Sequence, residues 1–346
     1  MSRWAVVLAG GIGSRFWPLS TPDRPKQLLP LVTANPLLRD AVDRLAPIVD
    51  PSHTLILTNA ALVKSIRSLL APVPRENIIP EPKPAGTAAA LTWAALTIER
   101  RDGGDATMIC VHADWAIAND AKFRETLLEA EQTARDTRTL VTVGIVPTRP
   151  DPSFGYIQPS KRDAPSGSPV KRFVEKPDAA RATQMRAEGY LWNSGIFVWR
   201  VADFLEQVHA HTPELKKALS LDANADAKEF FGNVNSPVSV DVGVLERSKK
   251  VTVLPGDFGW DDVGTWDALG RVRAKDEFGN VTSGSVHLLD CCDNVVHADT
   301  SRVVLYGVDN LVVVSHNGMT LVTTREKASD LKRLVDSLGA KEQAKQ

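Results

Sequence analysis

A glycine-rich segment near the start of the chain carries residues suited to binding phosphate. Gly10, Gly11 and Gly13 follow a run of apolar residues, and glycines after a buried strand let backbone N–H groups approach an anion closely. Arg15 and Lys26 come soon after in the sequence and could supply positive charge to the same anion. The segment favours a polyphosphate-binding loop, although a simple glycine-rich turn with two solvated cations would have the same composition.

Two familiar phosphate-binding motifs are absent from this segment. The Walker pattern does not occur, and the dinucleotide-binding pattern fails because Phe16 stands where a third glycine is required. If the loop binds a polyphosphate, it therefore does so in another way.

Asp114 follows an apolar segment and could hold a divalent cation beside a bound polyphosphate. Asp114 lies in HADW after one predicted strand, and Asp262 lies in GWDDVGTW much later in the chain. A carboxylate beside a triphosphate would be strongly repelled unless a cation bridged the two groups. The alternative for each residue is structural, because aspartate is common in turns and at helix starts.

Polar side chains that could bind a ligand occur in the middle of the chain. Glu175 and Lys176 stand together in FVEKP, and Asn193 lies in WNSGIF. An asparagine amide both donates and accepts hydrogen bonds, which suits sugar hydroxyls. The structural alternatives are an exposed ion pair, which contributes little to stability, and an asparagine in a turn. PSFGYI, which contains Gly155 and Tyr156, precedes these two segments.

The elements that would position these residues alternate between strands and helices. Continuous apolar runs predict strands at residues 4–9, 54–58, 107–111 and 140–146. Helices are expected to begin at Asn35, Thr87 and Asn119, which are suitable N-cap residues. Such alternation predicts βαβ units and a mostly parallel, Rossmann-like mixed sheet flanked by helices. Ligands of such sheets bind beyond the carboxyl ends of the strands, where the glycine-rich segment and Asp114 lie.

The pattern changes after Lys275, where short β runs are separated by Gly, Asp and Asn. We interpret residues 1–275 as the catalytic domain. Residues 276–346 are predicted to form a small β-rich, β-helix-like unit with a terminal helix. The sequence shows no strong internal repeat.

Bulk composition excludes several classes of protein. The 346 residues are 43% hydrophobic and 24% charged with a net charge of -1, which does not favour a nucleic-acid surface. No apolar run is long enough to span a bilayer. Cys110, Cys291 and Cys292 form no metal-binding or disulfide spacing, so we expect a reducing, cytoplasmic location.

The segment LAGGIGSRFWPLS followed by RPKQ resembles the signature of nucleotide-sugar pyrophosphorylases. It is most similar to that of the GDP-mannose pyrophosphorylases, also called mannose-1-phosphate guanylyltransferases. The resemblance covers nearly the whole chain and implies the fold of nucleotide-diphospho-sugar transferases. It also implies that Asp114 and Asp262 bind Mg²⁺ and that Lys176 holds the sugar phosphate, with Arg15 and Lys26 on the triphosphate.

The same resemblance implies the remaining contacts with the substrates. The expected nucleotide-binding residues are Leu8, Gly10, Gly11, Gly13, Arg15, Lys26, Glu81, Gly86 and Thr87. Within this set, Glu81 would accept hydrogen bonds from guanine, while Gly86 replaces an asparagine usual in the family. The expected sugar-phosphate-binding residues are Gly155, Tyr156, Glu175, Lys176 and Asn193.

The implied reaction transfers GMP from GTP to mannose 1-phosphate by in-line, Mg²⁺-assisted attack on the α-phosphate. One alternative is a transferase for another sugar 1-phosphate, such as glucose 1-phosphate, with a different base. Another is a non-catalytic nucleotide-sugar sensor, which would be expected to lose Lys26, Asp114 or Asp262. Relatives suggest a homodimer. Some carry a phosphomannose isomerase domain beyond the point where this chain ends, so we expect one activity.

Overall fold

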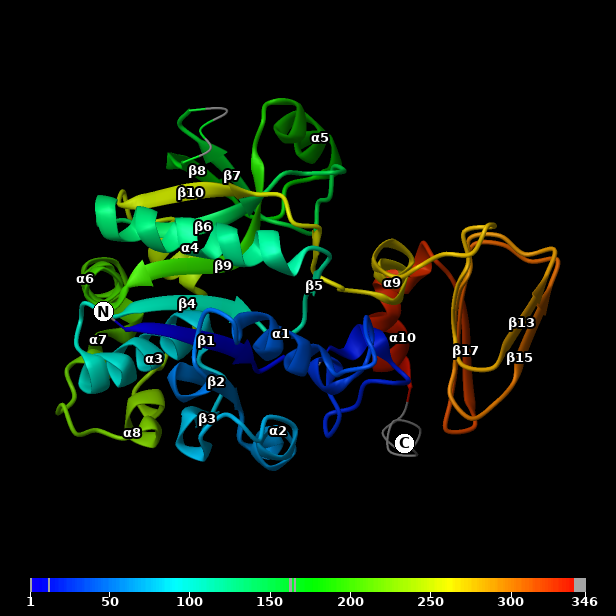
Figure 1. Ribbon diagram of the computed structural model, residues 1–346, viewed down its shortest axis with the longest axis horizontal. Coiled ribbons are helices and arrows are strands. Elements are labelled where there is room, and N and C mark those ends of the chain that lie inside the picture. Colours follow the sequence, from blue (N-terminus) through cyan, green and yellow to red (C-terminus); the bar gives the residue numbers. More distant parts are fainter. Residues whose placement is uncertain (1, 12, 162–163, 165, 339–346) are drawn as a thin grey trace. The chain divides into compact units, whose positions relative to one another are not determined.

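The computed structural model describes residues 2–11, 13–161, 164 and 166–338, and the chain forms two compact units (Figure 1). Unit 1 consists of Met1–Gly10, Val42–His112 and Asn119–Phe258. Unit 2 consists of Gly11–Ala41, Ala113–Ala118 and Gly259–Gln346. The predicted boundary at residue 275 does not coincide with this division, because two earlier segments join the C-terminal part in unit 2.

Unit 1 is built on a nine-stranded sheet with the order β3-β2-β1-β4-β9-β6-β10-β8-β7. Its strands are β1 (Arg3–Ala9), β2 (Thr54–Asn59), β3 (Ile78–Glu81), β4 (Thr107–His112), β6 (Leu140–Ile145), β7 (Tyr156–Pro159), β8 (Ser168–Val174), β9 (Leu191–Arg200) and β10 (Val251–Gly256). The four strands β3, β2, β1 and β4 run parallel. Their short, continuously buried runs are what a parallel sheet covered on both faces requires.

The rest of the sheet is mixed rather than mostly parallel. Strand β9 runs antiparallel to both β4 and β6, and β8 runs antiparallel to β7 and β10. Only β6 and β10 form a further parallel pair in the described sheet. The α/β class and the mixed sheet predicted from the sequence are confirmed, with a larger antiparallel share than expected.

Helices cover both faces of this sheet (Figure 1). Unit 1 contains α2 (Val63–Leu69), α3 (Gly86–Asp102), α4 (Asp120–Thr137), α5 (Ala179–Ala187), α6 (Val201–His211), α7 (Lys216–Leu219), α8 (Ala227–Gly232) and a π-helix (Asp241–Leu245). Helices α3 and α6 share one apolar core with β1 and β4, and α4 packs on β6 and β9. Among the described residues, no helix has the length and apolar character needed to cross a membrane.

Unit 2 combines a short two-stranded ribbon with a coil of parallel strands. The ribbon pairs β5 (Ala116–Ile117) with β11 (Trp260–Asp261), and α9 (Trp266–Val272) follows it. The coil contains β12 (Val281–Ser283), β13 (Val286–Leu289), β14 (Val295–Ala298), β15 (Val303–Tyr306), β16 (Leu311–His316) and β17 (Met319–Thr324), before α10 (Leu331–Ser337). Helix α1 (Leu37–Leu45) begins in unit 2 and ends in unit 1.

The coil confirms the β-helix-like character predicted for the tail. Strands β12, β14 and β16 stack in parallel, as do β13 and β15, while β17 closes one sheet antiparallel to β16 (Figure 1). Its inward valines form a core with Phe16, Trp17, Leu29 and Trp266. The tail and the 11–41 segment therefore depend on the same apolar core.

Stacked turns give the coil a structural repeat, although no strong internal repeat is expected from the sequence. Gly279, Asp293 and Asn310 each adopt a left-handed backbone conformation, with φ of 81°, 55° and 57°. Beside them, Asn294 donates its N–H to Asn280 Oδ1 at 3.0 Å and accepts from Leu311 N–H at 2.9 Å. Glycine, asparagine and aspartate all tolerate this conformation, so the repeat is one of backbone geometry and is only weakly visible in the sequence.

Candidate active site

Lys26 is the centre of the polar cluster in unit 2. It lies in the 3₁₀ turn Lys26–Leu28 and is only 5% exposed. Its Nζ donates to Asp114 Oδ2 at 2.9 Å and to the Asp262 carbonyl oxygen at 2.8 Å. A buried ammonium requires such acceptors, because removing it from water without them would be costly. The structure thus brings together three residues that are far apart in the sequence.

The glycine-rich loop is shaped to admit Lys26. Gly13 has φ of 68°, and a Cβ built on it would lie 2.3 Å from the Lys26 Cβ. A side chain at this position would therefore be strained and would also displace the lysine. Gly11 has open space around it, and Arg15 is exposed in the turn Ser14–Phe16. An exposed Arg15 is accessible to a phosphate ligand.

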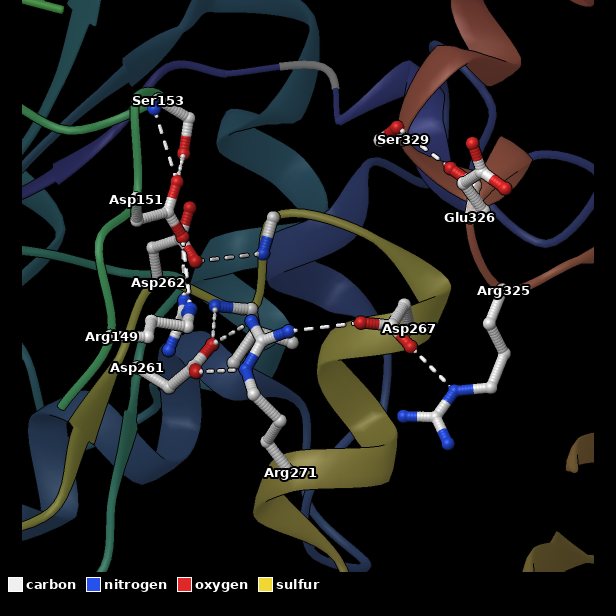
Figure 2. Close-up of polar contacts among 12 residues, drawn as sticks. Arg149, Asp151, Ser153, Asp261, Asp262, Asp267, Arg271, Arg325, Glu326 and Ser329 are labelled. Atoms are coloured by element: carbon white, nitrogen blue, oxygen red, sulfur yellow. Dashed lines mark hydrogen bonds and ion pairs between the residues drawn. The ribbon is translucent and has the colours of Figure 1, made fainter. Parts of the chain in front are cut away.

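Asp261 and Asp262 have different partners despite being neighbours. The guanidinium of Arg271 pairs with both carboxylate oxygens of Asp261, with Nε–Oδ2 at 2.8 Å and Nη2–Oδ1 at 3.1 Å (Figure 2). Asp262 Oδ1 accepts a long hydrogen bond from Gly264 N–H at 3.3 Å. Burial, followed by the neighbouring Asp261 charge, raises the pKa of Asp262 to about 6.

The oxygen donors of this cluster fit a magnesium ion. The carboxylates of Asp114 and Asp262 offer the hard oxygen atoms that Mg²⁺ prefers, and the Lys26 ammonium lies against the Asp114 carboxylate. In the described part of the chain no three His, Cys, Asp or Glu side chains form a closed metal cluster. Mg²⁺ does not need one, because it commonly takes one or two carboxylates and completes its shell with water and substrate phosphates.

In unit 1, Asn193 is oriented by the carboxylate of Asp241, which is not among the site residues expected from the sequence. Its Nδ2 donates to Asp241 Oδ1 at 2.7 Å, and its backbone N–H donates to the Gly155 carbonyl at 2.8 Å. Burial raises the pKa of Asp241, and the nearby charge of Glu175 acts in the same direction. The amide of Asn193 therefore has a defined orientation toward any ligand.

Asn193 lies inside strand β9 and not in a turn. The register between β6 and β9 shifts next to Gly144, which pairs with Asn193, and Gly195 has φ of 74°. A register shift of this kind redirects side chains near functional sites. The alternative of an asparagine in an ordinary turn is therefore wrong.

Glu175 and Lys176 directly follow β8. Lys176 Nζ lies 3.2 Å from Glu175 Oε1, and its backbone has φ of 42°, an uncommon value for a lysine. Gly155 leaves room for Glu175, since a Cβ there would lie 2.8 Å from Glu175 Oε2. Tyr156 is fully buried and its hydroxyl accepts from Asp151 N–H at 3.0 Å, so its side chain is not exposed to a sugar as expected from the resemblance.

A second group of predicted residues gathers at the carboxyl ends of β1 and β3. Glu81 ends β3, and its Oε1 would lie 3.8 Å from a Cβ on Gly10. Burial raises the pKa of Glu81 to about 7. Leu8 precedes this point as a buried residue of β1, so any ligand contact at that position would come from its backbone.

Gly86 and Thr87 contact the segment that leads to Asp241. Gly86 has φ of 82°, and a Cβ there would lie 2.3 Å from the Val238 carbonyl oxygen. Thr87 Oγ1 accepts from Val240 N–H at 2.9 Å. The N-cap of α3 is Ala85, without a side-chain hydrogen bond. The expectation that Thr87 caps this helix is therefore wrong, whereas Asn119 caps α4 as predicted.

Comparison with known proteins agrees with this fold. Residues 4–278 match the Nucleotidyl transferase family. A crystal structure described as mannose-1-phosphate geranyltransferase from Thermus thermophilus superposes with a TM-score of 0.90 at 34% identity. The match covers 97% of this chain and 99% of that one.

Curated relatives extend the match in sequence. A mannose-1-phosphate guanylyltransferase of Klebsiella pneumoniae is 36% identical over 96% of this chain and 73% of its own length. The alginate biosynthesis protein AlgA of Pseudomonas syringae is 33% identical over 96% of this chain and 71% of its own length. The chain therefore belongs to the nucleotidyl transferase family, and its curated relatives include a mannose-1-phosphate guanylyltransferase.

Proposed function

We propose that the protein transfers GMP from GTP to mannose 1-phosphate and forms GDP-mannose and pyrophosphate. The observation that carries this proposal is the buried Lys26, which joins the Asp114 carboxylate to the Asp262 backbone. The printed names of the relatives supply the substrates. A lysine and two carboxylates are the groups that a reaction between two phosphate anions needs.

Repulsion between the two anionic substrates is the first obstacle to the reaction. An oxygen of the sugar 1-phosphate attacks the α-phosphorus of GTP in line, and pyrophosphate leaves with the former α–β bridging oxygen. The attacking phosphate is already ionised near neutral pH, so no general base is required. Catalysis then consists of positioning and electrostatic stabilisation. Lys26 and Arg15 would stabilise the departing pyrophosphate.

Mg²⁺ held by Asp114 and Asp262 would neutralise phosphate charge when bound. Backbone N–H groups of Gly10, Gly11 and Gly13 would contact the triphosphate. Glycine has no side chain to contact the triphosphate, so the contribution of these residues depends on how the backbone directs its N–H groups.

Residues of unit 1 would recognise the base and the sugar. Glu81 would accept hydrogen bonds from guanine, with Gly86 and Thr87 alongside. Asn193 and Glu175 would bind sugar hydroxyls, and Lys176 would bind the sugar phosphate.

We further propose a cytoplasmic homodimer. All three cysteines are free, which suits a reducing compartment. A non-catalytic sensor is disfavoured because Lys26, Asp114 and Asp262 are all present.

A matrix of four nucleoside triphosphates against several sugar 1-phosphates tests the proposal, with pyrophosphate release as the measurement. We expect the highest kcat/KM with GTP and mannose 1-phosphate. A clearly higher value with another pair would change the substrates but not the class. No release with any pair, from a folded protein with Mg²⁺, would contradict the class.

Asp114→Asn and Asp262→Asn, which keep the side-chain shape, are the matched variants for this assay. Each should lower turnover by about 10²-fold or more, as removal of an electrostatic stabiliser does in other enzymes. Asp257→Asn is the control, because Asp257 is an exposed aspartate shortly before the same loop.

A further inference from the structure

A continuous chain of ion pairs runs through unit 2 from Asp261 to the tail. Arg271 pairs with Asp261 and, through Nη1, with Asp267 Oδ2 at 3.1 Å. Asp267 Oδ1 in turn accepts from Arg325 Nε at 2.6 Å. Figure 2 shows how these four side chains follow one another in space. Arg271 and Asp267 lie on α9, and Arg325 approaches from the C-terminal segment. Two arginines thus alternate with two carboxylates.

Arg325 is held firmly by the stacked turns of the tail. Its backbone N–H donates to the Asn310 carbonyl at 2.9 Å, and its Nη1 donates to the Asp293 carbonyl at 3.2 Å. Both acceptor residues, Asp293 and Asn310, belong to the stacked turns whose backbone is in the left-handed conformation. A Cβ on Gly270 would lie 2.9 Å from Arg325 Nη2, so a glycine in α9 provides space for the guanidinium.

Asp261, at the other end of this series of ion pairs, shapes the loop that carries Asp262. Asp261 Oδ1 accepts from Val263 N–H at 2.9 Å. Val263 is fully buried with φ of 45°, which is unfavourable for a β-branched residue and persists only when its surroundings enforce it. On the opposite side, Lys26 Nζ holds the Asp262 carbonyl. The backbone of Asp262 is therefore fixed by contacts on both sides.

Arg271 also separates the roles of two adjacent carboxylates. Its planar guanidinium matches a carboxylate through two nitrogens, and the carboxylate it matches is Asp261. Asp261 is 7% exposed, and a carboxylate buried to this degree is stabilised by a charged partner such as Arg271. With Asp261 satisfied in this way, Asp262 is the carboxylate of the pair that is suited to a cation.

We propose that Arg271 and Arg325 are positioning residues for the metal, and that the β-rich tail holds the Asp262 loop in its cation-binding shape. This inference rests on the proposed function, which assigns Mg²⁺ to Asp114 and Asp262. It gives the tail a part in catalysis beyond stability or assembly. Partners of metal ligands in other proteins typically change metal affinity by about 10–100-fold when removed.

Binding of Mn²⁺, measured by the electron paramagnetic resonance of free Mn²⁺ with GTP present and no sugar phosphate, tests this role without turnover. Arg271→Ala should raise the Mn²⁺ Kd by about tenfold or more. Arg325 is one ion pair further from Asp262 than Arg271 is. Arg325→Ala should therefore raise the Mn²⁺ Kd less, by about threefold to tenfold. Arg325→Lys keeps one charged contact and should recover part of the affinity.

A double-variant cycle shows whether Arg325 acts through the ion-pair chain. Asp267→Asn keeps the shape of the side chain and weakens both of its pairs, so the fold is expected to survive. In that background, Arg325→Ala should add little to the Mn²⁺ Kd. Independent, multiplying effects of the two changes would contradict transmission through Asp267.

Asp299→Asn is the matched control. It weakens a different tail ion pair, between Asp299 Oδ2 and His316 Nδ1 at 2.6 Å, and should leave the Mn²⁺ Kd unchanged. If it weakened Mn²⁺ binding as much as Arg325→Ala, general loosening of the tail would explain the result and the inference would fail.

Asp262→Asn separates failure of this inference from failure of the proposed function. If Asp262→Asn leaves Mn²⁺ binding unchanged, the metal assignment itself is wrong. If Asp262→Asn weakens binding while folded Arg271→Ala, Arg325→Ala and Asp267→Asn proteins bind Mn²⁺ normally, the metal assignment stands and the positioning role is refuted.

Discussion

Glu81 is a carboxyl group whose burial raises its pKa to about 7. Guanine presents two adjacent N–H donors, and an ionised carboxylate can accept from both, whereas a protonated one carries an O–H donor in place of one acceptor. If Glu81 binds the base, protonation below pH 7 should weaken GTP binding, and KM for GTP should rise as pH falls from 8 to 6. Glu81→Gln should bind GTP more weakly at pH 8 and show little of this pH dependence.

The same residue predicts an effect on folding with a defined sign. A folded-state pKa above the ordinary value of 4.5 means that the folded protein binds the proton more tightly than the unfolded chain. Glu81 therefore destabilises the fold progressively as pH rises from about 4.5 through 7. The Tm advantage of Glu81→Gln over the native protein should grow between pH 5 and pH 8. An equal difference at both pH values would contradict the raised pKa.

Lys176 offers a second test at the residue scale. Its side chain is two-thirds exposed and forms an ion pair with Glu175. Lys176→Ala should lower kcat/KM for the sugar phosphate by about tenfold or more, with a smaller effect on GTP, because a charge-assisted contact is lost. Lys171→Ala, an exposed lysine on β8, is the control. Unchanged kinetics would leave Lys176 as a surface ion pair.

At the scale of elements, the glycine-rich loop depends on Gly13. Gly13→Ala places a side chain at φ of 68° and only 2.3 Å from the Lys26 Cβ. The left-handed conformation alone costs about 1–2 kcal/mol for an ordinary residue. We expect a lower Tm and a loss of turnover, because Lys26 must move. Gly11→Ala has open space and should leave Tm unchanged; equal Tm losses for both variants would contradict this account.

Several elements could be predicted from the sequence because their signals are local. The buried run of β1 and the Asn119 cap of α4 needed no knowledge of distant residues. The glycines before Lys26 likewise indicated a backbone with special requirements. The prediction that Thr87 caps α3 was wrong because its hydrogen bond is not local. Its hydroxyl has the right position in the sequence to cap α3, but it bonds to Val240, which is remote in sequence.

Some residues could not be predicted from the sequence because their roles depend on ion pairs and hydrogen bonds with residues far away in the sequence. Arg271 and Arg325 stand in no recognised motif, and an isolated arginine resembles any solvated surface charge. Asp241 lies in a segment whose sequence is equally compatible with a purely structural aspartate. Only the fold shows that Arg271 meets Asp261 and that Asp241 meets Asn193. The stacked turns of the tail were missed because glycine, aspartate and asparagine replace one another in a single backbone conformation.

At the scale of the whole molecule, the homodimer remains a prediction. Leu289 and Tyr306 pair across β13 and β15, and both are more than half exposed. Exposed apolar side chains of this kind commonly mark interfaces. Light scattering should report a dimer for the native protein and a monomer for Leu289→Glu combined with Tyr306→Glu. A dimer that survives these changes would place the interface elsewhere.

Val322→Glu is the matched control for the dimer, since Val322 is equally exposed on β17 in a different sheet of the coil. Deleting the tail would be a poorer test. Tail residues such as Val281 and Val312 share a core with Trp17 and Trp266, so truncation should damage the loop that holds Lys26.

The most direct test of the central claim follows the oxygen atoms of the reaction. Mannose 1-phosphate carrying ¹⁸O at its three non-bridging phosphate oxygens is incubated with GTP, Mg²⁺ and the protein, and the products are analysed by mass spectrometry. Attack by the sugar phosphate on the α-phosphorus predicts GDP-mannose that retains all three labels and pyrophosphate that carries none. Labelled pyrophosphate, or GDP-mannose that has lost a label, would contradict the proposed reaction.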